Sequence, residues 1–364
     1  MSDYKPVGVA IVGCGNISGA YAKSFKTKPD KVNLIGCYDV EFPRAEAFGK
    51  EHGCQVYPTL DSLLSDFRIE IVANLTIHHA HAEITCKAFD AGKHVHSEKP
   101  LATTLADGRR CVELAEKKKL RLSCSPFTFL GEAQQTLLKA KNDGLIGKIL
   151  VAYSEMNWGR IESWHPNPIA FYQQGSGPLL DVGVYALTVL TSVLGPVKRV
   201  HGFARTVLPE RVIAKGAQAG QTFPVRTPDE VVGGLEFVSG VMGRLTASFI
   251  VRGTKQASGT ELHGETGSLF LSTNHDFHGA VEHYSNETGQ WSPLPYVREP
   301  HNGVEWGRAI FNLADSLRTG SRQYCTGRQA FHVLDTCLSI LQSAEKGRPV
   351  EVISTFEPPP PFPL

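Results

Sequence analysis

A glycine-rich turn between a short apolar run and a helical segment constrains the fold of this chain most strongly. Residues 7–12 are apolar and largely β-branched, and the stretch from Gly13 to Gly19 reads Gly-Cys-Gly-Asn-Ile-Ser-Gly. Gly13 permits a tight turn, Gly15 lets the backbone approach a pyrophosphate at the amino end of the next helix, and Ser18 is small enough for close helix–strand packing. The turn predicts a dinucleotide-binding unit, although a Gly-x-Gly turn alone often only connects two elements.

An acidic residue at the end of the second apolar run supports this prediction. Residues 32–38 lead to Asp39, twenty residues beyond Gly19, where a dinucleotide fold places a carboxylate against the adenosine ribose hydroxyls. Such a carboxylate would repel a 2′-phosphate, and Val40 offers no cation, although Arg44 is nearby. The pattern favours NAD over NADP. In the alternative interpretation, Asp39 only caps the following helix.

Apolar runs alternate with helical segments through the first third of the chain. Strands buried on both faces of a parallel sheet give this pattern. The expected strands are residues 7–12, 32–38, 69–75, 94–96 and 120–123, and the expected helices are residues 17–25, 41–51, 79–91 and 105–119. Gly53 and Gly92 follow two of these helices, where a left-handed residue is expected.

The pattern changes after about residue 125, where strands follow one another without intervening helices. Strands are expected at residues 148–155, 200–207, 230–238, 242–251 and 268–271, and helices at 132–141, 179–194, 303–318 and 328–345. Such a run of strands indicates a mostly antiparallel sheet. The proline-rich residues 357–364 cannot continue a helix and should form an extended surface arm.

The 364 residues are enough for two domains. We therefore predict an α/β protein. Residues 1–125 should form a Rossmann domain with a doubly wound parallel sheet. Residues 126–364 should form an α+β domain with a large, mostly antiparallel open sheet, used for substrate binding and oligomerisation.

Charge and cysteine content exclude several classes of partner. With 37 Lys and Arg against 36 Asp and Glu, the net charge is +1, so bulk charge attracts neither nucleic acid nor an anionic membrane. No apolar run approaches the roughly 18 residues of a membrane span, and the first residues do not resemble a secretory leader. Eight scattered cysteines without a C-x-x-C pair disfavour a zinc site and a disulfide framework. A cytoplasmic protein is expected.

Histidines and a Glu-Lys-Pro sequence lie where two of the expected strands end. Residues 76–81 read Thr-Ile-His-His-Ala-His, residues 91–95 read Ala-Gly-Lys-His-Val, and residues 98–100 read Glu-Lys-Pro. Open α/β sheets bind ligands at the carboxyl ends of their strands. Together with the glycine turn, these motifs resemble the family of glucose–fructose oxidoreductase and inositol 2-dehydrogenase (Gfo/Idh/MocA), which includes dihydrodiol dehydrogenases.

A second motif supports the resemblance. Residues 175–185 read Gly-Ser-Gly-Pro-Leu-Leu-Asp-Val-Gly-Val-Tyr, which is similar to the family's Gly-Gly-Gly-x-Leu-x-Asp-x-Gly-x-His segment. Tyr185 replaces the more common histidine, as it does in glucose–fructose oxidoreductase and in dihydrodiol and xylose dehydrogenases. Asp181 and Tyr185 are four residues apart, so one helical face presents both. The resemblance implies that Lys99, Asp181 and Tyr185 line the reacting centre.

The chemistry of these three residues fits hydride transfer from a carbinol carbon. The hydroxyl proton must be removed by a base whose pKa lies near the working pH. A free tyrosine titrates near about 10, and a neighbouring ammonium lowers that pKa. Our hypothesis makes Tyr185 the acid/base, Lys99 its activating cation and substrate anchor, and Asp181 an orienting carboxylate. In the alternative, Tyr185 is a core residue and Lys99 a surface lysine.

The resemblance also places the histidine loop near the nicotinamide. The predicted cofactor contacts are Gly13, Gly15, Asn16, Ile17, Asp39, Thr76, His79, His81, Glu98 and Lys99. His94 and His96 share one strand face and invite a metal interpretation. Because the chain supplies neither an H-E-x-x-H motif nor a cysteine set, no metal is predicted.

Substrate contacts are expected from an aromatic segment of the second domain. Residues 156–165 combine two indoles with polar groups, which suits a sugar with an apolar face flanked by hydroxyls. The alternative is that these aromatics pack a core or a subunit interface. The predicted substrate residues are Lys99, Phe127, Trp158, Arg160, Trp164, His165, Asp181 and Tyr185.

The sequence thus indicates an NAD(P)-dependent oxidoreductase acting on a CH–OH group of a neutral sugar, cyclic polyol or dihydrodiol. One alternative keeps NAD tightly bound for redox-neutral sugar chemistry, either glycoside cleavage through transient oxidation or sugar–sugar transhydrogenation. A further alternative is a non-catalytic dinucleotide-binding regulator. The resemblance also implies a homodimer or homotetramer formed through the exposed face of the second sheet.

Overall fold

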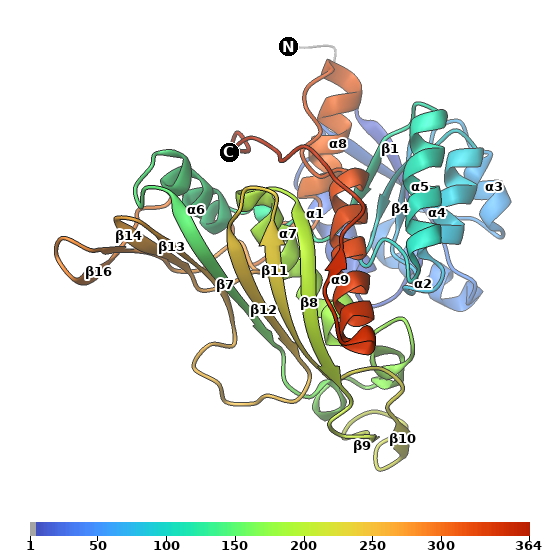
Figure 1. The fold of residues 1–364 in the computed structure, drawn as a ribbon. Coiled ribbons are helices and arrows are strands. Elements are labelled where there is room, and N and C mark those ends of the chain that lie inside the picture. Colours follow the sequence, from blue (N-terminus) through green and yellow to red (C-terminus); the bar gives the residue numbers. More distant parts are fainter. Residues whose placement is uncertain (1–4) are drawn as a thin grey trace. The chain divides into compact units, whose positions relative to one another are not determined.

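The structure, a computed structural model, describes residues 5–364, which form two compact units. The first unit runs to Phe127 and includes the later segment Glu305–Phe331, and the second comprises Thr128–Val304 and His332–Leu364 (Figure 1). From the sequence alone, residues 305–331 are expected in the second domain. In the structure their helix α8 (Arg308–Thr319) packs beside β6 (Leu122–Cys124) of the first unit.

The first unit contains a six-stranded sheet in the order β3-β2-β1-β4-β5-β6, with every pairing parallel. This order defines a doubly wound Rossmann fold and confirms the predicted fold class. Its strands are β1 (Val7–Val12), β2 (Val32–Tyr38), β3 (Gln55–Val56), β4 (Ile71–Asn74), β5 (His94–Ser97) and β6. Its early helices are α1 (Ser18–Phe25), α2 (Phe42–His52), α3 (Leu60–Leu64), α4 (His81–Asp90) and α5 (Leu105–Lys117).

Most of these elements match the expected ranges to within a few residues. Gly53 and Gly92 adopt left-handed φ angles of 73° and 75°, as predicted for residues that follow helices. Neither β3 nor α3 is predicted, because segments of two and five residues are too short to show a period.

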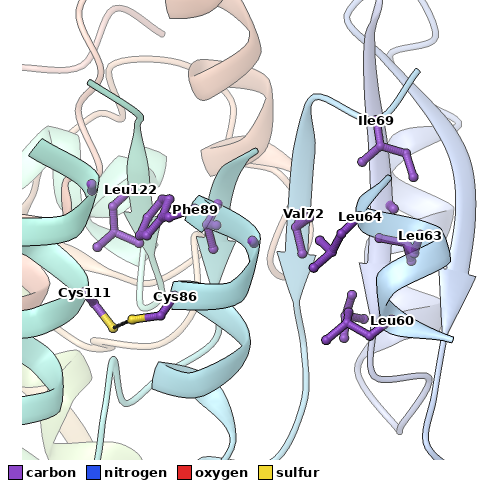
Figure 2. Close-up of a cluster of buried hydrophobic side chains, with 14 of the residues drawn as sticks. Leu60, Leu63, Leu64, Ile69, Val72, Cys86, Phe89, Cys111 and Leu122 are labelled. Atoms are coloured by element: carbon purple, nitrogen blue, oxygen red, sulfur yellow. Dashed lines mark hydrogen bonds between the residues drawn. The ribbon is translucent and has the colours of Figure 1, made fainter. Parts of the chain in front are cut away.

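A buried apolar cluster holds the strands of the first unit in place (Figure 2). Leucines of α3 pack toward Val72 of β4, while Phe89 of α4 lies beside Leu122 of β6. In the same cluster, the sulfur atoms of Cys86 in α4 and Cys111 in α5 lie 3.9 Å apart. Because β4 and β5 are fixed by this core, the loops that follow them at their carboxyl ends start from rigid positions.

The second unit contains a nine-stranded sheet in the order β16-β15-β14-β13-β7-β12-β11-β8-β17. Only the β7–β12 pairing is parallel among those described, so the prediction of a mostly antiparallel sheet is confirmed. The strands are β7 (Ile149–Asn157), β8 (Val197–Arg205), β11 (Glu230–Phe237), β12 (Met242–Ser248), β13 (Ser258–Gly264), β14 (Gly267–Leu271), β15 (Val281–Ser285), β16 (Gln290–Pro293) and β17 (Val350–Glu351). A separate two-stranded ribbon joins β9 (Glu210–Val212) to β10 (Thr222–Pro224).

Helices cover one face of this sheet. They are α6 (Glu132–Asn142), α7 (Val184–Leu194) and the long α9 (Gly327–Lys346). The unit also contains the short turns η1 (Thr128–Leu130), η2 (Ile161–Ser163), η3 (Ile169–Tyr172) and η4 (Leu179–Gly183). Ala152 and Met156 of β7 are fully buried on the helical face. On the opposite face Phe203 of β8 and Met242 of β12 are 73% and 65% exposed. The strands thus alternate between a buried and an open face.

The proline-rich tail forms no helix or strand after β17, in agreement with an extended arm. It is nevertheless attached to the second unit. Phe356 is buried and its ring lies 5.2 Å from that of His332, and the Phe362 N–H donates to Oε1 of Gln135 over 2.7 Å.

Candidate functional site

The glycine turn after β1 has the geometry of a ligand-binding loop. Gly13 has φ of +96°, and its N–H donates to the Tyr38 carbonyl at 2.8 Å. A Cβ there would lie 2.7 Å from the Leu75 carbonyl, so the neighbouring strand requires glycine. Gly15 is different, because a Cβ there would meet nothing within 4 Å. Glycine at 15 is therefore not needed for packing and leaves open space before α1.

Asn16 is exposed and Ile17 half-buried at the start of α1, so this loop presents backbone to solvent at a helix amino end. Such an end favours a negatively charged group. The residues of the loop fit a dinucleotide pyrophosphate, and the open space at Gly15 is the observation that supports this fit.

Asp39 lies at the carboxyl end of β2 with its carboxylate fixed by two backbone donors. Its Oδ2 accepts the Cys14 N–H at 2.7 Å, and its Oδ1 accepts the Glu41 N–H at 2.8 Å. The second bond holds Glu41, the residue that precedes α2, but no side chain caps the first turn of that helix. The first ties Asp39 to the glycine turn. A carboxylate has about four acceptor sites, so acceptors remain for ribose hydroxyls.

The loop after β4 is held by buried polar residues. Asn74 is fully buried, donating through Nδ2 to the His81 carbonyl at 2.9 Å and accepting the Thr76 hydroxyl through Oδ1 at 2.7 Å. His81 is also buried, and its two ring nitrogens lie 2.7 Å from the Pro100 carbonyl and 3.0 Å from the Thr76 carbonyl. Burial lowers the pKa of His81.

The two histidines predicted to contact cofactor therefore differ. His79 is exposed beside the loop, whereas His81 has both nitrogens directed at backbone carbonyls. The structure gives His81 a positioning role, because it ties the loop after β4 to the one after β5. Ile77 lies in the same loop and is 67% exposed, and it is not among the site residues predicted from the sequence. An apolar side chain at this edge suits a flat, apolar part of a ligand.

Glu98 fixes Lys99 at the carboxyl end of β5. The buried Glu98 carboxylate accepts the Tyr21 hydroxyl at 2.6 Å and the Ser125 hydroxyl at 2.9 Å through Oε1, and the Lys99 N–H at 3.1 Å through Oε2. Burial alone would raise the pKa of Glu98, but the charge of Lys99 and the Tyr21 hydrogen bond bring it below its ordinary value. Lys99 is half-buried, and the Lys99–Pro100 peptide bond is cis.

The two histidines of β5 have local partners. His96 contacts the hydroxyls of Tyr21 at 3.1 Å and Ser123 at 2.9 Å, and burial lowers its pKa to about 4. Nδ1 of His94 accepts the Arg121 N–H at 2.9 Å. Across residues 5–364 no group of three or more His, Cys, Asp or Glu side chains is arranged to hold a metal ion.

Asp181 and Tyr185 lie on consecutive turns where η4 passes into α7 of the second unit, and both are half-buried. The Asp181 N–H donates to the Gly177 carbonyl at 3.0 Å. Gly177 has φ of +90°, and a Cβ there would lie 2.9 Å from the Pro228 carbonyl. The turn before Asp181 therefore rests directly on the residues that precede β11. η4 is a π-helical turn, a feature frequently found at functional sites.

The aromatic segment begins where β7 ends. Trp158 is 37% exposed and Trp164 46% exposed. Arg160 and His165 are half-buried between and beside them, and the His165 ring lies 5.5 Å from that of Trp164. The segment thus contains four of the six predicted substrate residues of the second unit, and its two indoles are open to solvent.

His275 lies beside this segment and was not predicted from the sequence. The His275 ring meets the Trp158 ring edge to face, with 4.7 Å between centroids, and burial lowers its pKa. His275 belongs to the loop between β14 and β15, which is anchored by the fully buried Asn274. Nothing in the local sequence links His275 to Trp158, because the pairing of β13 with β7 and β14 brings them together.

The structure places Phe127 differently from the prediction. Its ring is 2% exposed and packs against His96 and Trp306, with centroids at 5.9 Å and 6.3 Å. Phe127 therefore belongs to the core of the first unit and presents no ring face to a substrate.

All eight cysteines are free thiols. Within residues 5–364, no helix combines the length and apolar character needed to cross a bilayer.

Family models match both parts of the chain. An oxidoreductase family model with an NAD-binding Rossmann fold matches residues 7–125, and the GFO/IDH/MocA C-terminal domain model matches residues 135–270. The chain belongs to the Gfo/Idh/MocA oxidoreductase family, as the sequence motifs indicated.

Individual relatives act on sugars according to their names. The chain is 28% identical over 225 residues to levoglucosan dehydrogenase of Pseudarthrobacter phenanthrenivorans, a match that covers 57% of this chain and 56% of that protein. It is 26% identical over 360 residues to D-glucoside 3-dehydrogenase of Escherichia coli K12, covering 95% and 98% of the two chains. A solved levoglucosan dehydrogenase in complex with NADH and levoglucosan shares the fold, with a TM-score of 0.82, 20% identity, and 96% and 100% coverage.

Proposed function

We propose that this protein is an NAD-dependent dehydrogenase that oxidises a carbinol carbon of a neutral sugar or cyclic polyol, or catalyses the reverse reduction. The observation that carries the proposal is the fixed position of Lys99, whose backbone is held by the buried Glu98 carboxylate at the sheet edge that also carries the glycine turn. In this proposal the first unit binds the cofactor and the second binds the substrate.

NAD, when bound, supplies the acceptor for the hydride that leaves the carbinol carbon. Tyr185 acts as the base that takes the hydroxyl proton, so that the C–O single bond becomes a carbonyl as the C–H bond breaks. The ammonium of Lys99 stabilises the phenolate form of Tyr185 and the developing charge on the substrate oxygen. Asp181, one turn before Tyr185, orients the substrate hydroxyl or Lys99.

The choice of NAD over NADP rests on Asp39. Its carboxylate is held in place by the Cys14 and Glu41 N–H groups, so it cannot turn away from a 2′-phosphate without losing two hydrogen bonds. A fixed negative charge at this position favours free ribose hydroxyls over a phosphate.

The substrate class follows from the aromatic segment. Trp158 and Trp164 offer exposed indole faces, Arg160 and His165 offer donors, and the His275 imidazole stands against Trp158. This combination suits a ring with an apolar face and several neutral hydroxyls. Since relatives are named for levoglucosan and D-glucosides, anhydrosugars and glucosides are the first substrates to test.

The open face of the second sheet supports a homodimer or homotetramer. Phe203, Val232 and Met242 project from neighbouring strands, and all three are exposed. A second copy of the chain that pairs this face would bury them. The eight free thiols suit a reducing compartment, and we expect a cytoplasmic location.

The proposal is tested by first measuring nucleotide that copurifies with the protein, and then assaying aldoses, inositols, anhydrosugars and glycosides with NAD and NADP. Reduction of NAD by at least one of these compounds is expected. Product formed without net reduction of added NAD would instead select redox-neutral chemistry with a retained cofactor. Dinucleotide binding without any turnover would indicate a regulator.

A further inference from the structure

A buried ionic network lies beneath the aromatic segment of the second unit. Nη1 of Arg211 lies 2.7 Å from Glu162 Oε1, and Nη2 lies 2.6 Å from Asp229 Oδ2. The three residues are 3%, 6% and 0% exposed. The Tyr172 hydroxyl donates to Glu162 Oε2 at 2.5 Å, and the Arg211 guanidinium stands over the Tyr172 ring at 4.9 Å.

One side of this network holds the aromatic segment. Glu162 lies in η2, between Arg160 and Trp164. The Tyr172 oxygen also accepts the Ile161 N–H at 3.2 Å. A backbone hydrogen bond from the chain after β9 also holds this segment, since the Ala214 N–H donates to the Glu162 carbonyl at 2.9 Å. Side chain and backbone of Glu162 are therefore both fixed.

The other side supports the turn that leads to Asp181. The carboxylate of Asp229 accepts the backbone N–H groups of Val207 and Leu208 at 2.6 Å and 3.2 Å. Immediately before Asp229, the Thr227 hydroxyl donates to the Ser176 carbonyl at 3.3 Å. Gly177, whose carbonyl accepts the Asp181 N–H, packs closely against Thr227 and Pro228.

Arg211 reaches this position through a long excursion of the chain. Arg205 at the end of β8 pairs with Glu230 at the start of β11, so a two-residue hairpin could join these strands. The chain instead runs through residues 206–229, which form the β9–β10 ribbon (Figure 1). The excursion is not needed to pair the strands, and it brings Arg211 and Ala214 into contact with Glu162 of the aromatic segment.

Burying a guanidinium between two carboxylates is a poor way to gain stability alone, because the desolvation of three charges offsets much of their attraction. A planar guanidinium does, however, fix the directions of two carboxylates at once. The buried network therefore suits a role in which geometry matters.

We propose that Arg211 is a positioning residue that fixes the aromatic segment relative to the Asp181 turn and thereby sets affinity and selectivity for the substrate without affecting the cofactor. This inference rests on the proposed function, in which the aromatic segment binds the sugar. Tyr172 and Glu162 act with Arg211 as members of the same network.

The experiment compares Tyr172→Phe and Arg211→Lys with a matched control, Tyr57→Phe. Tyr57 is a buried tyrosine of the first unit whose hydroxyl donates to Asp66 at 2.6 Å, while Arg68 pairs with the same carboxylate. The control therefore removes a buried tyrosine hydroxyl that also donates to an arginine-paired carboxylate, although the Arg68 side chain is 48% exposed and that of Arg211 only 2%. Measurements are KM and kcat for the best sugar and for one epimer, Kd for NAD, and Tm.

We expect Tyr172→Phe to raise the sugar KM about tenfold, the effect of losing one hydrogen bond to a charged group. Arg211→Lys should raise it further and reduce the discrimination between epimers, with Kd for NAD unchanged. Tyr57→Phe should lower Tm by a similar amount and leave KM unchanged. If all three variants lower Tm while KM and discrimination stay as in the unaltered protein, the network only stabilises the fold and the proposal is overturned.

Failure of the proposed function gives a different result, because the unaltered protein would then turn over no sugar. Deuterium exchange tests the positioning claim in that case. Tyr172→Phe should speed amide exchange several-fold in both residues 158–165 and residues 175–185, whereas Tyr57→Phe should change neither. Faster exchange in residues 158–165 alone would contradict a link between the aromatic segment and the Asp181 turn.

Discussion

The two units of this protein build their candidate sites by different means. In the first unit the residues come from successive strand ends, so Gly13, Asp39 and Lys99 are each fixed by the strand that they follow and by nearby hydrogen bonds. In the second unit the aromatic segment and the Asp181 turn depend on residues far along the chain, chiefly Arg211 and Asp229. The candidate cofactor site therefore depends mainly on local sequence motifs, and the candidate substrate site on contacts between residues far apart in the chain.

The largest expected effect is on proton transfer. Tyr185→Phe should lower kcat by about a thousandfold, within the range that general acid–base catalysis supplies. Kd for NAD should stay unchanged, since Tyr185 lies in the second unit. Steady-state kinetics and a nucleotide-binding titration test both statements. Near-full turnover in this variant would transfer the proton role to Lys99 or Asp181.

Both units contain buried histidines that link stability to pH, and His96 and His332 are the clearest case in each. Burial lowers the pKa of His96 in the first unit and of His332 in the second to about 4. Between their unfolded pKa of about 6.5 and pH 4, only the unfolded chain binds these protons, so the free energy of unfolding should fall as pH falls through this window.

At pH 4, the lower end of this window, each histidine should have lowered the free energy of unfolding by about 3 kcal/mol. Denaturant unfolding at a series of pH values measures the slope, and His96→Gln and His332→Gln should each flatten it. Equal flattening would show that the two units share this property of the core although their sites differ. An unchanged slope in both variants would contradict the assigned cause.

The two glycines of the turn after β1 separate folding from cofactor binding. Gly13→Ala should destabilise the protein by about 1–3 kcal/mol, because the residue has a positive φ and its Cβ would meet the Leu75 carbonyl. Gly15→Ala should leave Tm unchanged, because a Cβ there meets no other atom of the protein within 4 Å. It should weaken NAD binding about tenfold, because the added methyl group would occupy the space proposed for the pyrophosphate. Thermal melts and nucleotide titrations distinguish the two variants. If Gly15→Ala binds NAD as tightly as the unaltered protein, the turn is not part of the cofactor site.

An effect as small as that of Gly15→Ala is expected on dinucleotide choice. Asp39→Ser removes the charge but keeps a short polar side chain, and should reduce the preference for NAD over NADP by about tenfold. The ratio of kcat/KM for the two dinucleotides measures this preference. If the unaltered protein prefers NADP, the role assigned to Asp39 is wrong.

The same contrast explains what could be predicted from sequence. The parallel sheet, the antiparallel sheet and the left-handed Gly53 and Gly92 follow from local period and glycine placement, and the structure confirms them. The return of residues 305–331 to the first unit could not be predicted, because an amphipathic helix does not specify which apolar surface it covers.

Side-chain roles show the same limit. The sequence marks His81 as a polar residue in a ligand-binding loop, but only the folded chain shows its ring between the Thr76 and Pro100 carbonyls. Phe127 lies in the core for a similar reason, since Trp306 arrives from a distant part of the chain. His275 and Arg211 carry no motif and reach the aromatic segment through sheet pairing and the 206–229 excursion.

The central claim is direct hydride transfer from a sugar carbon to NAD, and isotope transfer tests it most directly. The sugar with the highest turnover is supplied with deuterium at each ring carbon in turn, and the reduced cofactor is analysed by mass spectrometry. The account predicts deuterium in the reduced cofactor for one labelled carbon only, with the rate of transfer lowered about a thousandfold in Tyr185→Phe. Reduced cofactor that carries no deuterium from any labelled position would contradict it.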